Sequence, residues 1–385
     1  MPSFVDLADV PVVDNHCHAI DAQQPTGLAN WRALFTESPD PGMRAREAAD
    51  TAFYRRLTRS LEAFYGVSGE EGVLRAREGR STEELVGELF RDASIGGVVI
   101  DTGYPAPEKA MGEKEFRAAS GSDYVALLRL EVAFQELVVE HDSFEDLVDS
   151  VRELVADVRG AGFAGFKSIA AYRTGLAIER WSDDDARTSY AHARVEAGSS
   201  GTVRLGHKPL LDTLLHLAFE AAASQELPVQ FHVGYGDPDV DLRKASPLEL
   251  RSLLEDPTYR SMPVVLLHGC WPYFREGAYL ASVYGNAYLD VSYAIPFLSI
   301  GEMTSMTRAA LAVAPFTKLM YSSDGSRVPE LNWIAAKDGR RVIGSVLGEL
   351  VTDGDLGSDE ARRAGEQILR DNALQLYGFG AEGAR

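Results

Sequence analysis

The hydrophobic pattern of this chain alternates between short apolar runs and longer amphipathic stretches. Eight short runs, several of them apolar almost throughout, are typical of strands buried on both faces of a parallel sheet. They cover residues 10–16, Ile95–Asp101, Tyr124–Leu130, Gly162–Ser168, Pro228–His232, Pro263–His268, Ala287–Val291 and Lys318–Ser322. Between them, stretches such as Phe144–Arg159 and Pro209–Ala223 carry apolar residues three and four positions apart, as helices packed on a sheet do. The alternation predicts an α/β fold, a (β/α)8 TIM barrel, with a doubly wound open sheet as the alternative.

Two connections are longer than the rest. Residues 20–93 look helical and predict a helical insertion after strand 1 that caps one end of the barrel. Residues 174–207 predict a partly helical excursion with a flexible turn. No internal repeat or interdomain linker is visible, so we expect residues 1–385 to form a single barrel domain. The last helix is expected over Asp359–Tyr377, with a frayed tail after it.

Side chains that bind metals or carry protons stand at the ends of most predicted strands. His16 and His18 close the first run, and alternating strand side chains would direct both imidazoles to one side. The other strands end on, or are followed by, Lys167, His232, His268 and Asp324. Because active sites of barrel enzymes lie at the carboxyl ends of the strands, we expect all six side chains to meet in a metal centre. The alternative is a set of ordinary polar residues in turns.

The order His-x-His, Lys, His, His, Asp on successive strands resembles the amidohydrolase superfamily, in its amidohydrolase-2 branch. The stretches 165–176, 231–242, 268–292 and 321–330 are similar to the branch related to the N-terminal domain of fungal FluG-type proteins. This resemblance implies a metal-dependent hydrolase with one or two divalent ions per chain. Zinc is the first expectation, and iron or manganese are the alternatives.

The resemblance implies one of two metal centres. In a mononuclear centre, the two histidines of the first strand, His232 and Asp324 hold the ion, and His268 acts as acid, base or electrophile. In a dinuclear centre, Lys167 carries CO₂ as a carbamate that bridges two ions, and His268 joins the second one. Without such a role, Lys167 would form an ion pair with Asp324 or bind substrate.

The expected chemistry is attack by a metal-bound hydroxide on a C–N bond, of the amide type, in a small polar substrate. Asp324 would accept a proton from the water and pass it to the leaving group. Three alternatives use the same barrel: a dinuclear iron or manganese hydroxylase that activates O₂, a decarboxylase of a small carboxylic acid, and a non-catalytic subunit that stabilises a partner.

Further side chains are expected around the substrate and the ligands. Those expected to bind substrate are Tyr172, Arg173, Trp271 and Arg327. The guanidinium of Arg173 suits a substrate carboxylate, with a salt bridge inside its loop as the alternative. Asp101 and Glu131, at the ends of the second and third predicted strands, are expected to orient ligands.

Composition narrows the partners and the compartment. The chain has 58 acidic and 38 basic side chains and a net charge of −20, which argues against nucleic acid and anionic membrane as partners. Neither a signal peptide nor a long apolar segment is visible, so we expect a cytoplasmic protein. Cys17 and Cys270 are expected to be free thiols. We expect a homo-oligomer, with a hetero-oligomer containing a related barrel subunit as the alternative.

Overall fold

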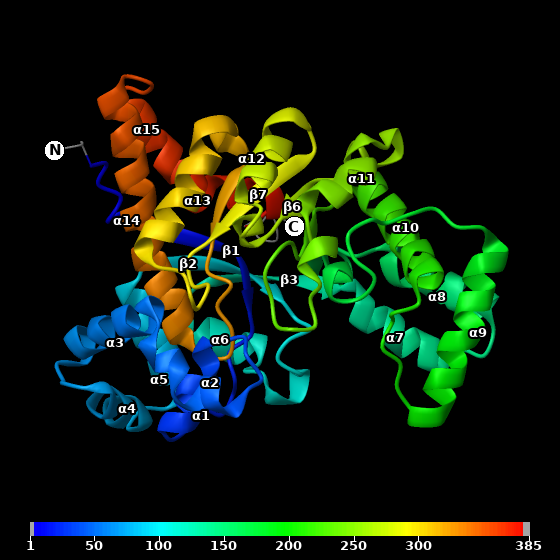
Figure 1. Cartoon of the computed structure of the whole chain (residues 1–385), viewed down its shortest axis with the longest axis horizontal. Helices are drawn as coiled ribbons and strands as arrows, with labels where there is room; N and C mark the ends of the chain where they lie inside the picture. The colour runs from blue at the N-terminus through cyan, green and yellow to red at the C-terminus, as the bar shows by residue number, and fades with distance from the viewer. Residues whose placement is uncertain (1–3, 380–385) are drawn as a thin grey trace. The chain divides into compact units, whose positions relative to one another are not determined.

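Eight parallel strands carry the fold in the computed structural model, which describes residues 4–379 (Figure 1). They are β1 (Val12–His18), β2 (Ile95–Asp101), β3 (Asp123–Arg129), β4 (Phe163–Ser168), β5 (Val229–Phe231), β6 (Val264–Leu266), β7 (Ala287–Ser292) and β8 (Leu319–Ser322). Every residue of β5, β6 and β8 is buried, including the polar Gln230 and Ser322, as expected for strands covered on both faces.

The strands follow one another in the sheet in the order of the sequence, β1 to β8. The first and last strands are neighbours as well. The backbone N–H of Asp324, just after β8, donates to the carbonyl of His16 at 3.0 Å, and the N–H of His18 donates to the carbonyl of Gly325 at 2.8 Å. This order, with helices between the strands, is that of a (β/α)8 barrel, as predicted. A doubly wound sheet would reverse its strand order partway.

The chain divides into two compact units. The first comprises Met1–Tyr124, Gly236–Pro238 and Asp290–Gln375. Its helices are α1 (Leu28–Arg32), α2 (Pro41–Ala45), α3 (Ala52–Tyr65), α4 (Glu70–Glu78), α5 (Thr82–Asp92), α6 (Glu113–Ser120), α13 (Ile300–Val313), α14 (Pro329–Asp353), α15 (Ser358–Glu366) and most of α16 (Asn372–Tyr377). Helices α1 to α5 gather in one cluster (Figure 1), so the segment 20–93 is helical as predicted.

The second unit comprises Val125–Tyr235, Asp239–Leu289 and Leu376–Arg385. Its helices are α7 (Leu130–Glu140), α8 (Phe144–Ala156), α9 (Asp183–Ser200), α10 (Lys208–Gln225), α11 (Arg251–Glu255) and α12 (Phe274–Val283). Helix α9 occupies most of the second long connection. Its final residues and the left-handed Gly201 form the Gly-Ser-Ser-Gly sequence, which is a helix end rather than a flexible turn.

The first strand differs from its prediction. Instead of residues 10–16, β1 covers Val12–His18, because backbone pairing with β2 continues until His18 lies opposite Asp101. Backbone hydrogen bonds do not depend on side-chain polarity, so the strand continues through His16 and ends at His18. Both therefore lie inside a strand, and the alternative of an exposed polar turn is wrong for this pair.

Other boundaries were also displaced. Glu131 does not end the third strand but lies in the first turn of α7. The strands β5 and β6 are shorter than predicted, so His232 and His268 follow them. The last helix is interrupted by a π-helical segment, Gln367–Asp371, between α15 and α16. The predicted frayed tail lies largely outside the described residues.

Two further predictions concern thiols and membranes. Cys17 and Cys270 are buried free thiols, as expected. Within residues 4–379, none of the helices combines the length and the apolar character needed to cross a membrane.

Candidate metal site

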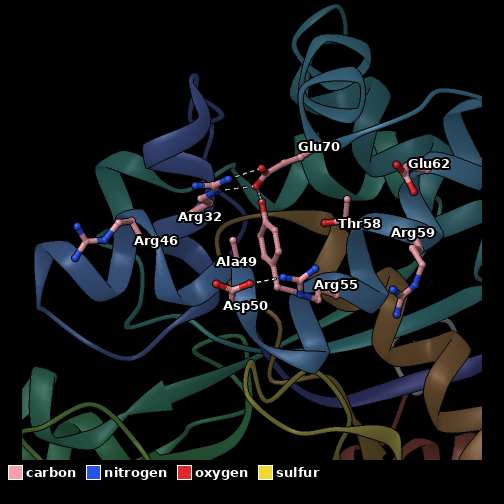
Figure 2. A pocket seen from close by; sticks show the side chains of 10 residues that line it. Arg32, Arg46, Ala49, Asp50, Arg55, Thr58, Arg59, Glu62 and Glu70 are labelled. Carbon is pink, nitrogen blue, oxygen red and sulfur yellow. Dashed lines mark hydrogen bonds and ion pairs between the residues drawn. The ribbon is translucent and has the colours of Figure 1, made fainter.

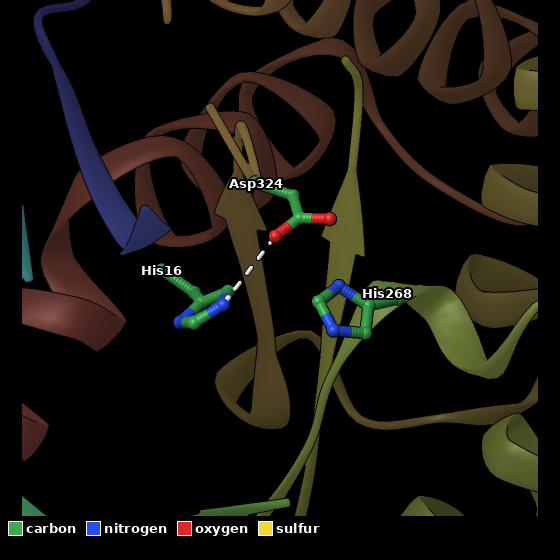
Figure 3. Close-up of side chains that lie close together, drawn as sticks. All are labelled: His16, His268 and Asp324. Atoms are coloured by element: carbon green, nitrogen blue, oxygen red, sulfur yellow. Dashed lines mark ion pairs between the residues drawn. The ribbon is translucent and has the colours of Figure 1, made fainter. Parts of the chain in front are cut away.

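The first unit brings His16, His18 and Asp324 together, as the sequence predicts. The Nε2 atoms of His16 and His18 lie 3.4 Å and 3.6 Å from the same oxygen, Oδ1 of Asp324. Figure 3 shows the ring of His16 and its ion pair with this carboxylate. The two imidazoles meet edge to face, with ring centroids 5.0 Å apart. Two imidazole nitrogens and one carboxylate oxygen thus converge at one point.

Asp101 completes this group of donors. It is the last residue of β2, is fully buried, and its Oδ2 lies 3.8 Å from Nδ1 of His18. One donor atom from each of His16, His18 and Asp101 lies within 4.8 Å of the others. The sequence predicts Asp101 as an orienting residue, and the distances are also compatible with a metal ligand.

A buried network holds the loop that carries Asp324. Asp324 itself has a left-handed backbone, with φ of 56°, which is uncommon for a residue with a side chain. The carboxylate of Asp14 accepts from the backbone N–H of Ser323 at 2.8 Å and from the side-chain amide of Asn332 at 3.1 Å. A Cβ on Gly325 would lie 2.8 Å from the Asn332 side chain, so the loop requires glycine there. This network holds the backbone of the loop from which the Asp324 side chain projects.

Two acidic residues near this loop were missed by the sequence reasoning. Burial raises the pKa of Asp14 to about 6, against the lowering effect of its hydrogen bonds. Burial and the negative charges of Asp324 and Asp237 raise the pKa of Glu37 to about 7. Asp14 could have been noticed because it precedes His16 by two residues on the same strand. Glu37 carries no such signal, since only the tertiary fold brings it near Asp324.

The second unit holds the other predicted ligands. Lys167, near the end of β4, is 1 % exposed. Nε2 of His268 lies 2.8 Å from Nδ1 of His232, whose own Nε2 lies 2.6 Å from the carbonyl oxygen of Tyr235. If His232 donates to that carbonyl, its Nδ1 carries a lone pair and accepts from His268.

His268 resembles Asp324 in its backbone. His268, Gly269 and Cys270 have φ values of 63°, 56° and 55°, three left-handed residues in succession. Such conformations cost free energy and concentrate at functional sites. Both residues that are expected to move protons thus stand in strained loops just after their strands.

The predicted substrate-binding residues have different surroundings. The ring of Tyr172 packs against His232, with centroids 4.4 Å apart. The ring of Trp271 lies 6.5 Å from that of Tyr235. Arg327 pairs with Asp21 at 2.9 Å. Among the described residues 4–379, no carboxylate lies within ion-pair distance of Arg173.

A separate hollow lies among the helices of the first unit (Figure 2). Its volume is about 510 Å³, and it contains none of the predicted site residues. Of its four arginines, Arg32 is paired with Glu70 at 2.6 Å and Arg55 is paired with Asp50. Much of its charge is therefore neutralised internally, and we do not assign it to the active site.

Comparisons with known proteins show what this chain resembles. The sequence model of the amidohydrolase family matches residues 13–379. Protein fluG of Emericella nidulans is 30% identical over 95% of this chain, which spans 45% of that protein. A crystal structure from Lactobacillus casei, provisionally described as a metal-dependent hydrolase, is 28% identical, with a TM-score of 0.88 over 99% of this chain and 100% of that one.

A more distant structure shares the fold alone. The uronate isomerase of Thermotoga maritima is 13% identical, with a TM-score of 0.70 over 96% of this chain and 95% of that one. The family match covers nearly the whole barrel, including both histidines of β1 and Asp324. The chain therefore belongs to the amidohydrolase family.

Proposed function

We propose that this protein is a metal-dependent hydrolase that cleaves a C–N bond, of the amide type, in a small polar substrate. The observation that carries the proposal is the convergence of His16 and His18 on Oδ1 of Asp324. The Lactobacillus casei protein, provisionally described as a metal-dependent hydrolase, supports hydrolysis as the reaction type.

The donor set fits a divalent ion. Neutral imidazole and carboxylate are the ligands of catalytic zinc, and they also suit iron and manganese. The side chain of His16 is fully buried, whereas those of His18 and Asp324 are 13% and 14% exposed. The group is thus held firmly on one side and is accessible to water on the other. We propose one or two ions per chain, with zinc as the first choice.

The second unit supplies further ligands in this proposal. His232 offers Nδ1 and His268 offers Nε2, the two nitrogens that face each other at 2.8 Å. Lys167, buried near the end of β4, would bridge two ions as its carbamate if two ions bind. With a single ion, His268 would instead act on the substrate as acid, base or electrophile.

The roles of the side chains follow from their positions. A divalent ion lowers the pKa of a coordinated water and polarises a carbonyl group, which is the chemistry that amide hydrolysis requires. Asp324 accepts the proton and returns it to the leaving nitrogen, because its carboxylate is partly exposed and its loop is fixed by Asp14. Asp101, whose Oδ2 lies 3.8 Å from Nδ1 of His18, would orient this ring, and Nε2 of His18 faces Asp324.

Hydrolysis can be tested with a panel of small N-acyl amino acids and their amides. The expected result is release of free amine that stops after treatment with a chelator and returns when zinc, iron or manganese is added. Release that survives complete removal of metal would contradict the proposal. Oxygen consumption or CO₂ release in place of amine release would identify a hydroxylase or a decarboxylase instead.

A further inference from the structure

Basic side chains gather at the carboxyl ends of β3 and β4 in the second unit. Arg129, the last residue of β3, is paired in register with Lys167 of β4. Arg173 follows β4 in a short loop, where the positive charges of Arg204 and Arg129 act on its guanidinium. In a protein with a net charge of −20, such a gathering of cations requires an explanation.

Arg173 lacks the salt bridge that would explain it as a structural residue. Across residues 4–379, no carboxylate lies within ion-pair distance of its guanidinium. Its Nε is buried without a hydrogen-bond partner, and its one hydrogen bond is a long one, 3.3 Å from Nη1 to the carbonyl of Tyr172. A guanidinium has five N–H donors, so most of its hydrogen-bonding capacity is unused.

The nearest acidic residues are already engaged elsewhere. Glu131 accepts from the hydroxyl of Ser168 at 2.7 Å and from the backbone N–H of Ile169 at 2.9 Å. Asp239 pairs with Arg204 at 2.8 Å. Burial and the charge of Arg204 lower the pKa of Arg173 by more than the charges of Glu131 and Asp239 raise it. A bound anion would supply the missing charge.

The position of Arg173 relates it to the candidate ligands. Its neighbour Tyr172 packs on the ring of His232 at 4.4 Å, and Arg204 donates to the carbonyl of Tyr172 at 2.9 Å. Tyr172 therefore connects Arg173 and Arg204 to His232, a proposed metal ligand.

We propose that Arg173, with Arg204 beside it, binds an anionic group of the substrate, a carboxylate or a phosphate. Guanidinium groups bind both through paired, charge-assisted hydrogen bonds. That the anion belongs to a molecule that is hydrolysed rests on the function proposed above. That Arg173 binds an anion does not depend on that function.

Binding can be measured by calorimetry with the full chain as purified. The probes are acetate, benzoate, glutarate, N-acetylglycinate and inorganic phosphate, and the neutral counterparts are acetamide, benzamide and N-acetylglycinamide. We expect at least one anion to bind, its neutral counterpart not to bind, and Arg173→Gln to weaken binding about tenfold or more. Comparing the affinities of the carboxylates with that of inorganic phosphate shows which kind of anion the site binds. Absence of binding by every anion, or undiminished binding to Arg173→Gln, would overturn the proposal.

Two controls separate this site from others. Arg59→Gln removes an exposed arginine of the hollow in Figure 2 and should leave anion binding unchanged. If Arg59→Gln abolishes binding and Arg173→Gln does not, the anion site lies in that hollow and the proposal is wrong. The thermal midpoint without ligand should be equal or higher in Arg173→Gln, since a half-buried, unpaired cation is removed. A large loss of stability would indicate a structural role instead.

The two proposals fail in different ways. If anions bind through Arg173 but no amide is cleaved, the hydrolase proposal fails and the anion site stands. Suppose instead that amide bonds are cleaved, but that N-acyl amino acids and their uncharged amides react at equal rates in the wild type and in Arg173→Gln. The anion-site proposal then fails and the hydrolase proposal stands.

Discussion

His16 and Asp324 are joined both through their backbones and through their side chains. The N–H of Asp324 donates to the carbonyl of His16 at 3.0 Å, and Nε2 of His16 lies 3.4 Å from Oδ1 of Asp324. Because the first and last strands are neighbours, the imidazole of His16 and the carboxylate of Asp324 meet without a long flexible connection. Such preorganisation is what a metal site or a proton transfer requires.

Asp324→Asn should preserve the fold and remove most hydrolytic activity. The amide keeps the size of the side chain but cannot accept a proton, and loss of a general base typically costs about 100-fold or more in kcat. The check is the rate of amine release beside the circular dichroism spectrum. Unchanged turnover would exclude Asp324 from the proton transfer.

Asp101→Asn should weaken metal binding without abolishing it. The carboxylate lies 3.8 Å from Nδ1 of His18, and losing a residue that orients a ligand costs about 10- to 100-fold in metal affinity. Zinc affinity can be measured by competition with a chelating dye. An unaltered affinity would show that Asp101 does not act on the site, and complete loss would indicate direct coordination.

The helical insertion should depend on one buried ion pair for its stability. Arg77 of α4 and Glu330 of α14 are 1% and 0% exposed, with Nε and Oε1 2.6 Å apart. Glu330→Gln leaves the arginine without a counter-charge, and we expect a loss of about 3 to 5 kcal/mol in the free energy of unfolding.

The exposed pair of Arg75 and Glu71 provides the matched control for this prediction. Its side chains are 72% and 79% exposed. Glu71→Gln should therefore change the free energy of unfolding by less than about 1 kcal/mol in the same urea titration. Equal effects of the two substitutions would refute a special role for the buried pair.

His216 should make the protein less stable in mild acid. Its ring contacts the hydroxyl of Tyr259 at 2.7 Å and the carbonyl of Glu179 at 3.2 Å. Burial and the charge of Arg180 lower its pKa from 6.5. The unfolded chain therefore binds this proton more readily than the native one, and stability falls as the pH decreases below about 6.5.

The thermal midpoint between pH 5 and 7.5 tests the role of His216. The wild type should lose more stability on acidification than His216→Gln, and the difference isolates this group from other titrations. His192→Gln, a change at an exposed histidine of α9, should follow the wild type. Identical slopes for the wild type and His216→Gln would contradict the assignment.

The fold was largely predictable because its signals are local. Short, largely apolar runs identified all eight strands to within one or two residues, since burial on both faces disfavours polar side chains. The first strand was misplaced because its buried face carries polar residues. Cys17 and His18 pair with β2, although the polar residues before them suggested that the strand ends at His16.

The candidate site was predictable only in part. His16, His18 and Asp324 could be grouped because their positions at strand ends and the family resemblance agree. The bonds of Asp14 to Ser323 and Asn332, and the approach of Glu37 to Asp324, depend on tertiary packing between distant segments. No local pattern encodes them.

The metal content of the protein, purified without added metal, tests the central claim most directly. Elemental analysis should find one or two divalent ions per chain in the wild type and in His192→Ala, and none in His16→Ala. A full complement of metal in His16→Ala would contradict the account. So would a wild-type protein that binds no zinc, iron or manganese even when each is supplied.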